Sequence, residues 1–266
     1  MEPNEIRIHY VTHFLKLSLW YVHRLLQIEG GLFADVVNAR VNIYRNTNFY
    51  EGGNKVPSRG HVDLAWNEYL EGLKAIFDRH ITDTGKLEEE GLAYLWPRVI
   101  KTGGRASANR RPYECWTFDD GEDYIAIHIA NVYQPKSPLS DMRIPFAASL
   151  LRLLGDTQQR RPEVKMVRCG SWMNSVPPFQ AMFPESWHKS AVLSPRSGFG
   201  MGHWGQFADR VGRFHERNGA KLRETGDFPN PSLSCRAPID EIVFHLRQHF
   251  PEAVVYNEQK NGNSGV

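Results

Sequence analysis

The sequence predicts one globular domain of the α/β or α+β class over residues 1–266, with a short flexible tail near 257–266. Two patterns carry this prediction. A long apolar helix pattern opens the chain, and two strand-like segments, 123–132 and 164–169, are joined by a helical one. A chain of 266 residues with 41% hydrophobic residues can build a substantial core, and no shift in composition marks a linker.

Residues 6–28 have the pattern of a long helix. Apolar side chains recur at spacings of three and four, and Gly30-Gly31 ends the pattern. Most of the other positions are apolar too, which predicts a largely buried helix. Its one polar stripe includes His9 and His13.

The next elements are predicted from alternation and from capping signals. Residues 36–49 alternate between apolar and polar side chains, which is typical of a strand with one solvated face. Helices are expected at 63–80, where Asp63 can cap the first turn, and at 86–100, where acidic residues follow the start.

The middle of the chain predicts the sheet. Asp120-Gly121 separates two strand-like runs and indicates a hairpin, and the second run is apolar on both faces, as in a central strand. The helical segment FAASLLRLLGD and the strand-like PEVKMVRC follow. Strand, helix and strand in this order are typical of a crossover between parallel strands. We therefore expect a single mixed sheet with a βαβ crossover, flanked by helices.

Two further helices are expected in the last third of the chain. One covers 203–218 and is stopped by Gly219. The other covers 238–250, with Pro238 in its first turn and Pro251 as its terminator.

The predicted crossover indicates where a site would lie. Parallel strands have their carboxyl ends at the same edge of a sheet, and open α/β sheets bind ligands there. We expect a pocket at this edge, roofed by the loops of 171–206. The amides, tryptophans and cations expected to bind substrate are Asn131, Trp172, Asn174, Arg196, His203, Trp204, Gln206 and Arg98.

Four side chains are candidates for catalysis: His128, His188, Ser171 and Cys169. His128 stands in a strand among aliphatic residues, where burial would lower its pKa and leave a neutral imidazole as general base. His188 follows in a loop-rich segment. Each candidate has a structural alternative, because core histidines and inert buried thiols are common and Cys-Gly-Ser-Trp lacks the turn of an elbow nucleophile.

The favoured hypothesis is a soluble cytoplasmic transferase or hydrolase that acts on a small polar molecule without a tightly bound organic cofactor. Basic residues outnumber acidic ones by only 32 to 30 and are spread along the chain, so neither nucleic acid nor a membrane is expected as a partner. Three widely spaced cysteines fit a reducing compartment, and the N-terminus lacks the features of a signal peptide.

Two alternatives remain open. A mononuclear metal-dependent enzyme would use loop histidines, although no metal ligand is assigned. The pairs His9/His13 and His245/His249 have the spacing of one helical face, but they lack the glutamate of His-Glu-x-x-His, and a polar stripe explains the first pair better. The other alternative is a non-catalytic module that binds a ligand or partner through its tryptophan-rich loops.

Overall fold

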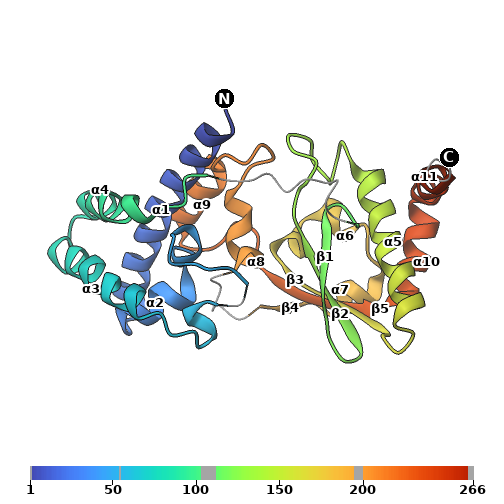
Figure 1. Cartoon of the computed structure of the whole chain (residues 1–266), viewed down its shortest axis with the longest axis horizontal. Helices are drawn as coiled ribbons and strands as arrows, with labels where there is room; N and C mark the ends of the chain where they lie inside the picture. The colour runs from blue at the N-terminus through green and yellow to red at the C-terminus, as the bar shows by residue number, and fades with distance from the viewer. Residues whose placement is uncertain (1, 54, 103–111, 195–199, 263–266) are drawn as a thin grey trace. The chain divides into compact units, whose positions relative to one another are not determined.

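The computed structural model describes residues 2–53, 55–102, 112–194 and 200–262. Its contacts divide the chain into two compact units, residues 1–103 with 195–229 and residues 104–194 with 230–266 (Figure 1). Each unit has its own hydrophobic core. The single domain over residues 1–266 stays a prediction from the sequence, based on the absence of a compositional shift that would mark a linker.

The first unit is helical in its described residues. Its elements are α1 (Pro3–Ile28), α2 (Phe33–Arg40), η1 (Tyr44–Asn46), η2 (Pro57–Arg59), α3 (Leu64–Arg79), α4 (Thr84–Leu95), η3 (Trp96–Arg98), α8 (Met201–Trp204), η6 (Gly205–Phe207) and α9 (Glu216–Thr225). The long N-terminal helix is confirmed. α1 begins with a capping box formed by Glu2 and Glu5, and it contacts α2, α4 and α9 within this unit.

The helices α3 and α4 agree with the capping signals in the sequence. The Asp63 carboxylate accepts a hydrogen bond from the backbone amide of Trp66 at 2.9 Å, as predicted. α4 begins two residues earlier than expected, because Asp83 caps it by accepting from the amide of Lys86. The helix was predicted to continue to residue 100, but α4 ends at Leu95 and the short helix η3 follows it.

The strand predicted for 36–49 is wrong. Residues 33–40 form the helix α2, and η1 follows. Phe33, Val36 and Val37 have helical spacing and are all buried, so they form one apolar face of a helix. The alternation that suggested a strand continues through Val41 and Ile43, which are buried but lie beyond the end of α2.

The continuous helix predicted for 203–218 is also wrong. The segment consists of α8, η6, a tight turn and the start of α9. The Asp209 carboxylate accepts hydrogen bonds from the amides of Val211 and Arg213, and Gly212 has a φ of 93°. Gly219, predicted to stop the helix, lies inside α9.

The second unit is built around a five-stranded mixed sheet with the order β1-β2-β3-β5-β4. Its strands are β1 (Trp116–Asp120), β2 (Tyr124–Ile129), β3 (Met166–Ser171), β4 (Val192–Leu193) and β5 (Leu233–Pro238). β1 and β2 form the hairpin predicted from Asp120-Gly121. β5 is antiparallel to both β3 and β4.

The predicted βαβ crossover is confirmed, and with it the mixed α/β class. α5 (Arg143–Arg160) connects β2 to β3, and these strands pair in parallel with Ile125 opposite Val167. Alternate side chains along both strands are buried in the core of this unit. The side chains between them are more exposed. β2 was predicted to be covered on both faces, but only one of its faces is buried.

The remaining helices of this unit are η5 (Trp172–Ser175), α6 (Pro177–Gln180), α7 (Glu185–Lys189), α10 (Ile239–His249) and α11 (Pro251–Gly262). The helices α5, α10 and α11 contact one another (Figure 1). The helix expected at 238–250 is present. Pro251 ends α10 but also begins α11, and residues 257–260 of the predicted flexible tail lie in this helix.

Among the residues that the structure describes, no helix combines the length and the apolar character needed to cross a membrane.

Candidate functional site

The residues selected from the sequence fall into both units. His128, Asn131, Cys169, Ser171, Trp172, Asn174 and His188 belong to the second unit, and Arg98, His203, Trp204 and Gln206 belong to the first. Arg196, the remaining candidate, lies outside the described residues. The two sets are therefore considered separately.

Asn174 lies just beyond β3, as expected, but its amide group is fully engaged within the protein. Its nitrogen donates to the carbonyl oxygens of Cys169 at 3.0 Å and Leu233 at 2.8 Å. Its oxygen accepts a hydrogen bond from the indole of Trp187. Asn174 therefore joins β3, β5 and α7. Both of its side-chain polar atoms already have partners inside the protein, and the residue is 2% exposed.

The two candidate nucleophiles at the end of β3 are both buried. Cys169 is 3% exposed, and its burial, together with the nearby thiol of Cys235, raises its pKa to about 12. The Ser171 hydroxyl accepts a hydrogen bond from the amide of Met173 and caps η5. A thiol of this kind remains protonated at neutral pH, so Cys169 has the properties of a core residue.

His128 and His188 do not have the buried setting expected of a general base. The side chain of His128 is 54% exposed and its Nε2 lies 3.0 Å from the carboxylate of Asp119 on the neighbouring strand. It was predicted to be buried, but it lies on the exposed face of β2. His188 is exposed too, and its Nε2 is 3.2 Å from the carbonyl oxygen of Phe183.

The other two candidates of this unit support its loops. The Asn131 side chain accepts from the amide of Tyr133 and donates to the carbonyl of Lys136, which closes the loop after β2. Trp172 packs, partly buried, against the hydrophobic core of the second unit.

The candidates in the first unit also contribute to packing. Trp204 is fully buried, donates its indole hydrogen to the carbonyl of Arg40, and was expected to form a pocket wall. His203 packs edge-on against Phe228, and its desolvation lowers its pKa. The buried Gln206 donates to the carbonyl of His203.

Arg98 belongs to the same unit and remains exposed. Its guanidinium lies over the rings of Phe49 and Tyr69, 5.3 and 5.8 Å from their centroids.

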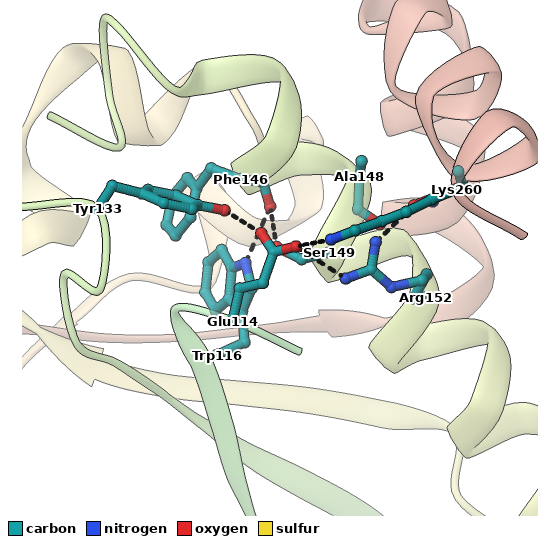
Figure 2. Close-up of polar contacts among 9 residues, drawn as sticks. Glu114, Trp116, Tyr133, Phe146, Ala148, Ser149, Arg152 and Lys260 are labelled. Carbon is teal, nitrogen blue, oxygen red and sulfur yellow. Dashed lines mark hydrogen bonds and ion pairs between the residues drawn. The ribbon is translucent and has the colours of Figure 1, made fainter. Parts of the chain in front are cut away.

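A buried carboxylate that the sequence analysis did not consider lies in the second unit. Glu114 is 6% exposed and has a φ of 55°, a left-handed conformation that costs a non-glycine residue about 1–2 kcal/mol. Its carboxylate accepts hydrogen bonds from the Tyr133 hydroxyl and the Lys260 ammonium, and Arg152 lies 3.3 Å away (Figure 2). These contacts connect the loop after β2, α5 and α11.

The Glu114 cluster has the electrostatics of a structural site. Burial alone would raise the pKa of Glu114, but the hydrogen bonds from Lys260 and Tyr133 outweigh it and lower this pKa. The pKa of Tyr133 is raised, first by burial and then by its bond to Glu114. The carboxylate therefore stays charged and the phenol neutral near pH 7, so neither is suited to exchange a proton with a substrate.

A cluster with ligand character lies in the first unit. His9 and His13 are one turn apart on α1, with ring centroids separated by 4.6 Å, and Glu216 is the first residue of α9. Each histidine has a ring nitrogen 3.9 Å from Oε1 of Glu216. One potential ligand atom from each residue lies within 4.8 Å of the other two, and no other such group of three occurs among the described residues.

The turn before α9 holds Glu216 in this position. The backbone pairs Ala208 with Phe214, and the amide of His215 donates to the carbonyl of Phe207. The His215 ring caps α9 by accepting from the amide of Asn218 at 3.3 Å. These bonds fix the start of α9, and α9 contacts α1.

A cavity of about 450 Å³ adjoins the cluster. Its lining residues are His9, Asp209, Arg213, Phe214, His215, Glu216 and Arg217. Two residues of the cluster, His9 and Glu216, therefore belong to its wall.

The lowered pKa of His13 favours metal binding. Desolvation lowers the pKa of His13, and the nearby His9 and Lys16 act in the same direction, which outweighs the opposite effect of Glu216. The imidazole of His13 is thus neutral at pH 7, which is the form that binds a metal ion. Nδ1 of His9 is buried and has no hydrogen-bond partner among the described residues, so the polar contact of this ring is through Nε2, toward Glu216.

His9 and His13 could be recognised as a pair from the sequence, whereas Glu216 could not. The spacing of the histidines indicated a shared helical face, and a polar stripe on a buried helix was the favoured interpretation. Glu216 belongs to a distant segment that was predicted to lie inside a continuous helix. No local pattern connects the two segments, and only the packing of α9 on α1 brings them together.

Comparison of this chain with protein-family models, with curated proteins and with solved structures finds no match.

Proposed function

We propose that the first unit is a mononuclear metal-dependent hydrolase that binds one divalent transition-metal ion through His9, His13 and Glu216. The observation that supports this most strongly is the approach of three ligand atoms to within 4.8 Å of one another, beside a cavity. The substrate would be a small polar molecule bound in the cavity.

The set of donor atoms suits such an ion. Two imidazoles and one carboxylate form a ligand set found in catalytic zinc sites, where the remaining position holds water or substrate. A tetrahedral ion with ligand distances near 2.0 Å separates its ligands by about 3.3 Å. The present 3.9 Å between Glu216 and each histidine is slightly longer, and the Glu216 side chain is 67% exposed.

The chemistry of the proposal follows from the open coordination position. A bound divalent ion lowers the pKa of a coordinated water and polarises a carbonyl or phosphoryl group. His215, another residue of the cavity wall, accepts a hydrogen bond at Nδ1, which leaves its Nε2 as the ring nitrogen that can donate a hydrogen bond to a substrate.

The alternative with His128 and His188 as general bases has less support from the structure. Both imidazoles are exposed and lie within hydrogen-bond distance of a carboxylate or a carbonyl group. The proposal keeps the cytoplasmic location expected from the sequence, since the three cysteines are free thiols and fit a reducing compartment.

The proposal is tested by titrating the full chain, purified without a histidine tag, with Zn²⁺ or Co²⁺ in a calorimeter. We expect one ion per chain, and loss of this binding in His13→Ala and in Glu216→Gln. The site should also empty as the pH falls and protons compete for the imidazoles.

His245→Ala is the matched control. His245 and His249 have the same helical spacing and a ring separation of 4.4 Å, but no third ligand joins them among the described residues. This variant should bind the ion as the wild type does. Less than a tenth of an equivalent bound to the wild type, or binding that survives both cluster variants, would overturn the proposal.

A further inference from the structure

We infer that the cavity beside the cluster selects a small anionic ligand, a carboxylate or a phosphate group that meets the side chain of Arg217. This inference rests on the proposed metal site, because it assigns the class of molecule that would occupy the open coordination position.

The charges of the cavity wall carry the inference. The residues that line the cavity include two acidic ones, Asp209 and Glu216, and two arginines, Arg213 and Arg217. Arg213 is paired with Asp209 at 3.3 Å, so these two charges offset each other. Asp209 also accepts the backbone amide of Arg213, which holds this pair within the turn.

The remaining two charged residues, Glu216 and Arg217, are not paired with each other. Glu216 faces His9 and His13, where it would neutralise one charge of a divalent ion. Arg217 has no hydrogen-bond or ion-pair partner among the residues that the structure describes. With the ion bound, the wall would therefore carry one excess charge from the ion and one from Arg217.

A ligand that neutralises both charges would be an oxyanion. One oxygen could occupy the open position on the ion while another accepts hydrogen bonds from the guanidinium, whose planar donors match carboxylate and phosphate. A neutral molecule of the same size could use the first interaction only. The cavity should consequently prefer anions over neutral isosteres.

Absorption spectroscopy of the Co²⁺-loaded full chain tests this inference. Acetate and methylphosphonate represent the two sources of negative charge, and acetamide is the neutral isostere of acetate. We expect acetate, methylphosphonate or both to change the cobalt absorption bands at concentrations at which acetamide has no effect. The stronger of the two anions identifies the preferred ligand class.

Arg217→Gln should keep the cobalt spectrum that is recorded without an anion. It should weaken anion binding by up to about fivefold, the upper end for an exposed ion pair. Arg210→Gln is the matched control, because Arg210 is an exposed arginine in the turn before α9 and does not line the cavity. It should bind anions as the wild type does.

The outcomes separate the inference from the proposed function. Cobalt binding with equal responses to acetate and acetamide, or anion binding unaffected by Arg217→Gln, would overturn the anion preference and leave the metal site intact. If the wild type binds no cobalt, the proposed function fails, and this inference fails with it.

Discussion

The indole nitrogen of Trp187 donates a hydrogen bond to the side-chain oxygen of Asn174 at 3.1 Å, inside the core of the second unit. Asn174 also holds two backbone carbonyl groups, one from β3 and one from β5. A residue that the sequence suggested for substrate binding thus holds together the end of the sheet.

Asn174→Ala should therefore lower the free energy of unfolding by about 3 kcal/mol, because buried polar groups lose their partners. Urea unfolding of the full chain, followed by tryptophan fluorescence, measures this loss. Asn131→Ala is the control, since Asn131 also makes two hydrogen bonds but lies in a less buried loop. A stability of Asn174→Ala equal to that of Asn131→Ala would contradict the structural role of Asn174.

Glu114→Gln should destabilise the second unit by about 3 kcal/mol, because it leaves the charges of Lys260 and Arg152 without their buried partner. Hydrogen exchange at the amides of α11 measures the effect, since Lys260 belongs to this helix. Glu185→Gln removes an exposed ion pair with Lys189 and should leave stability nearly unchanged.

The same carboxylate predicts a pH dependence. The pKa of Glu114 in the folded protein is lowered from its ordinary value of 4.5. Its contribution to stability is therefore fully present above pH 4.5, and it is lost as the pH falls below this value through the pKa of the folded state. In this acidic range Glu114→Gln should show a shallower loss of stability than the wild type. Parallel pH profiles of the two proteins would contradict this assignment.

The thiols of Cys169 and Cys235 should be unreactive in the folded protein. Burial raises their pKa values to about 12 and about 11, respectively, so almost no thiolate exists at pH 8. Ellman's reagent should label them slowly in the native protein and should detect all three cysteines after denaturation. Fast labelling of Cys169 in the native state would restore it as a candidate nucleophile.

Several elements could be predicted from the sequence because their signals are local. The periodicity of α1, the cap at Asp63 and the hairpin at Asp120-Gly121 each involve neighbouring residues. The crossover between β2 and β3 followed from the order of the strand-like and helical segments and from the length of the connection between the strands. The prediction of a strand at 36–49 was wrong because the alternation of apolar residues there overlaps with the helical spacing of the apolar residues in 33–37.

The surroundings of the candidate site residues were harder to predict, because the partners of these residues are distant in sequence. His128 was expected to be buried from its aliphatic neighbours, but alternate residues of a strand face opposite sides, and this side chain lies on the exposed side. Cys169 and Asn174 were correctly placed near the end of β3. Whether the polar atoms of these residues already have hydrogen-bond partners depends on where β5 and α7 pack. A local sequence pattern does not predict that packing.

The proposed metal site should depend on Gly219, a positioning residue inside α9. A Cβ atom at this position would lie 2.5 Å from the ring of Phe214, closer than two carbon atoms can approach. Phe214 stacks on His13 with ring centroids 5.6 Å apart. Gly219→Ala must therefore move the ring that supports a proposed ligand, and we expect a loss of stability of about 1–3 kcal/mol with weaker cobalt binding.

Gly155→Ala is the control for this substitution. Gly155 lies inside α5 of the other unit, and a Cβ atom there would meet nothing within 4 Å. The added methyl group should stabilise the helix by about 0.5–1 kcal/mol and leave cobalt binding unchanged, because alanine has less conformational freedom to lose than glycine. Calorimetric cobalt titration and thermal unfolding of both variants separate the two positions. Equal behaviour would show that the approach of α9 to Phe214 does not position His13.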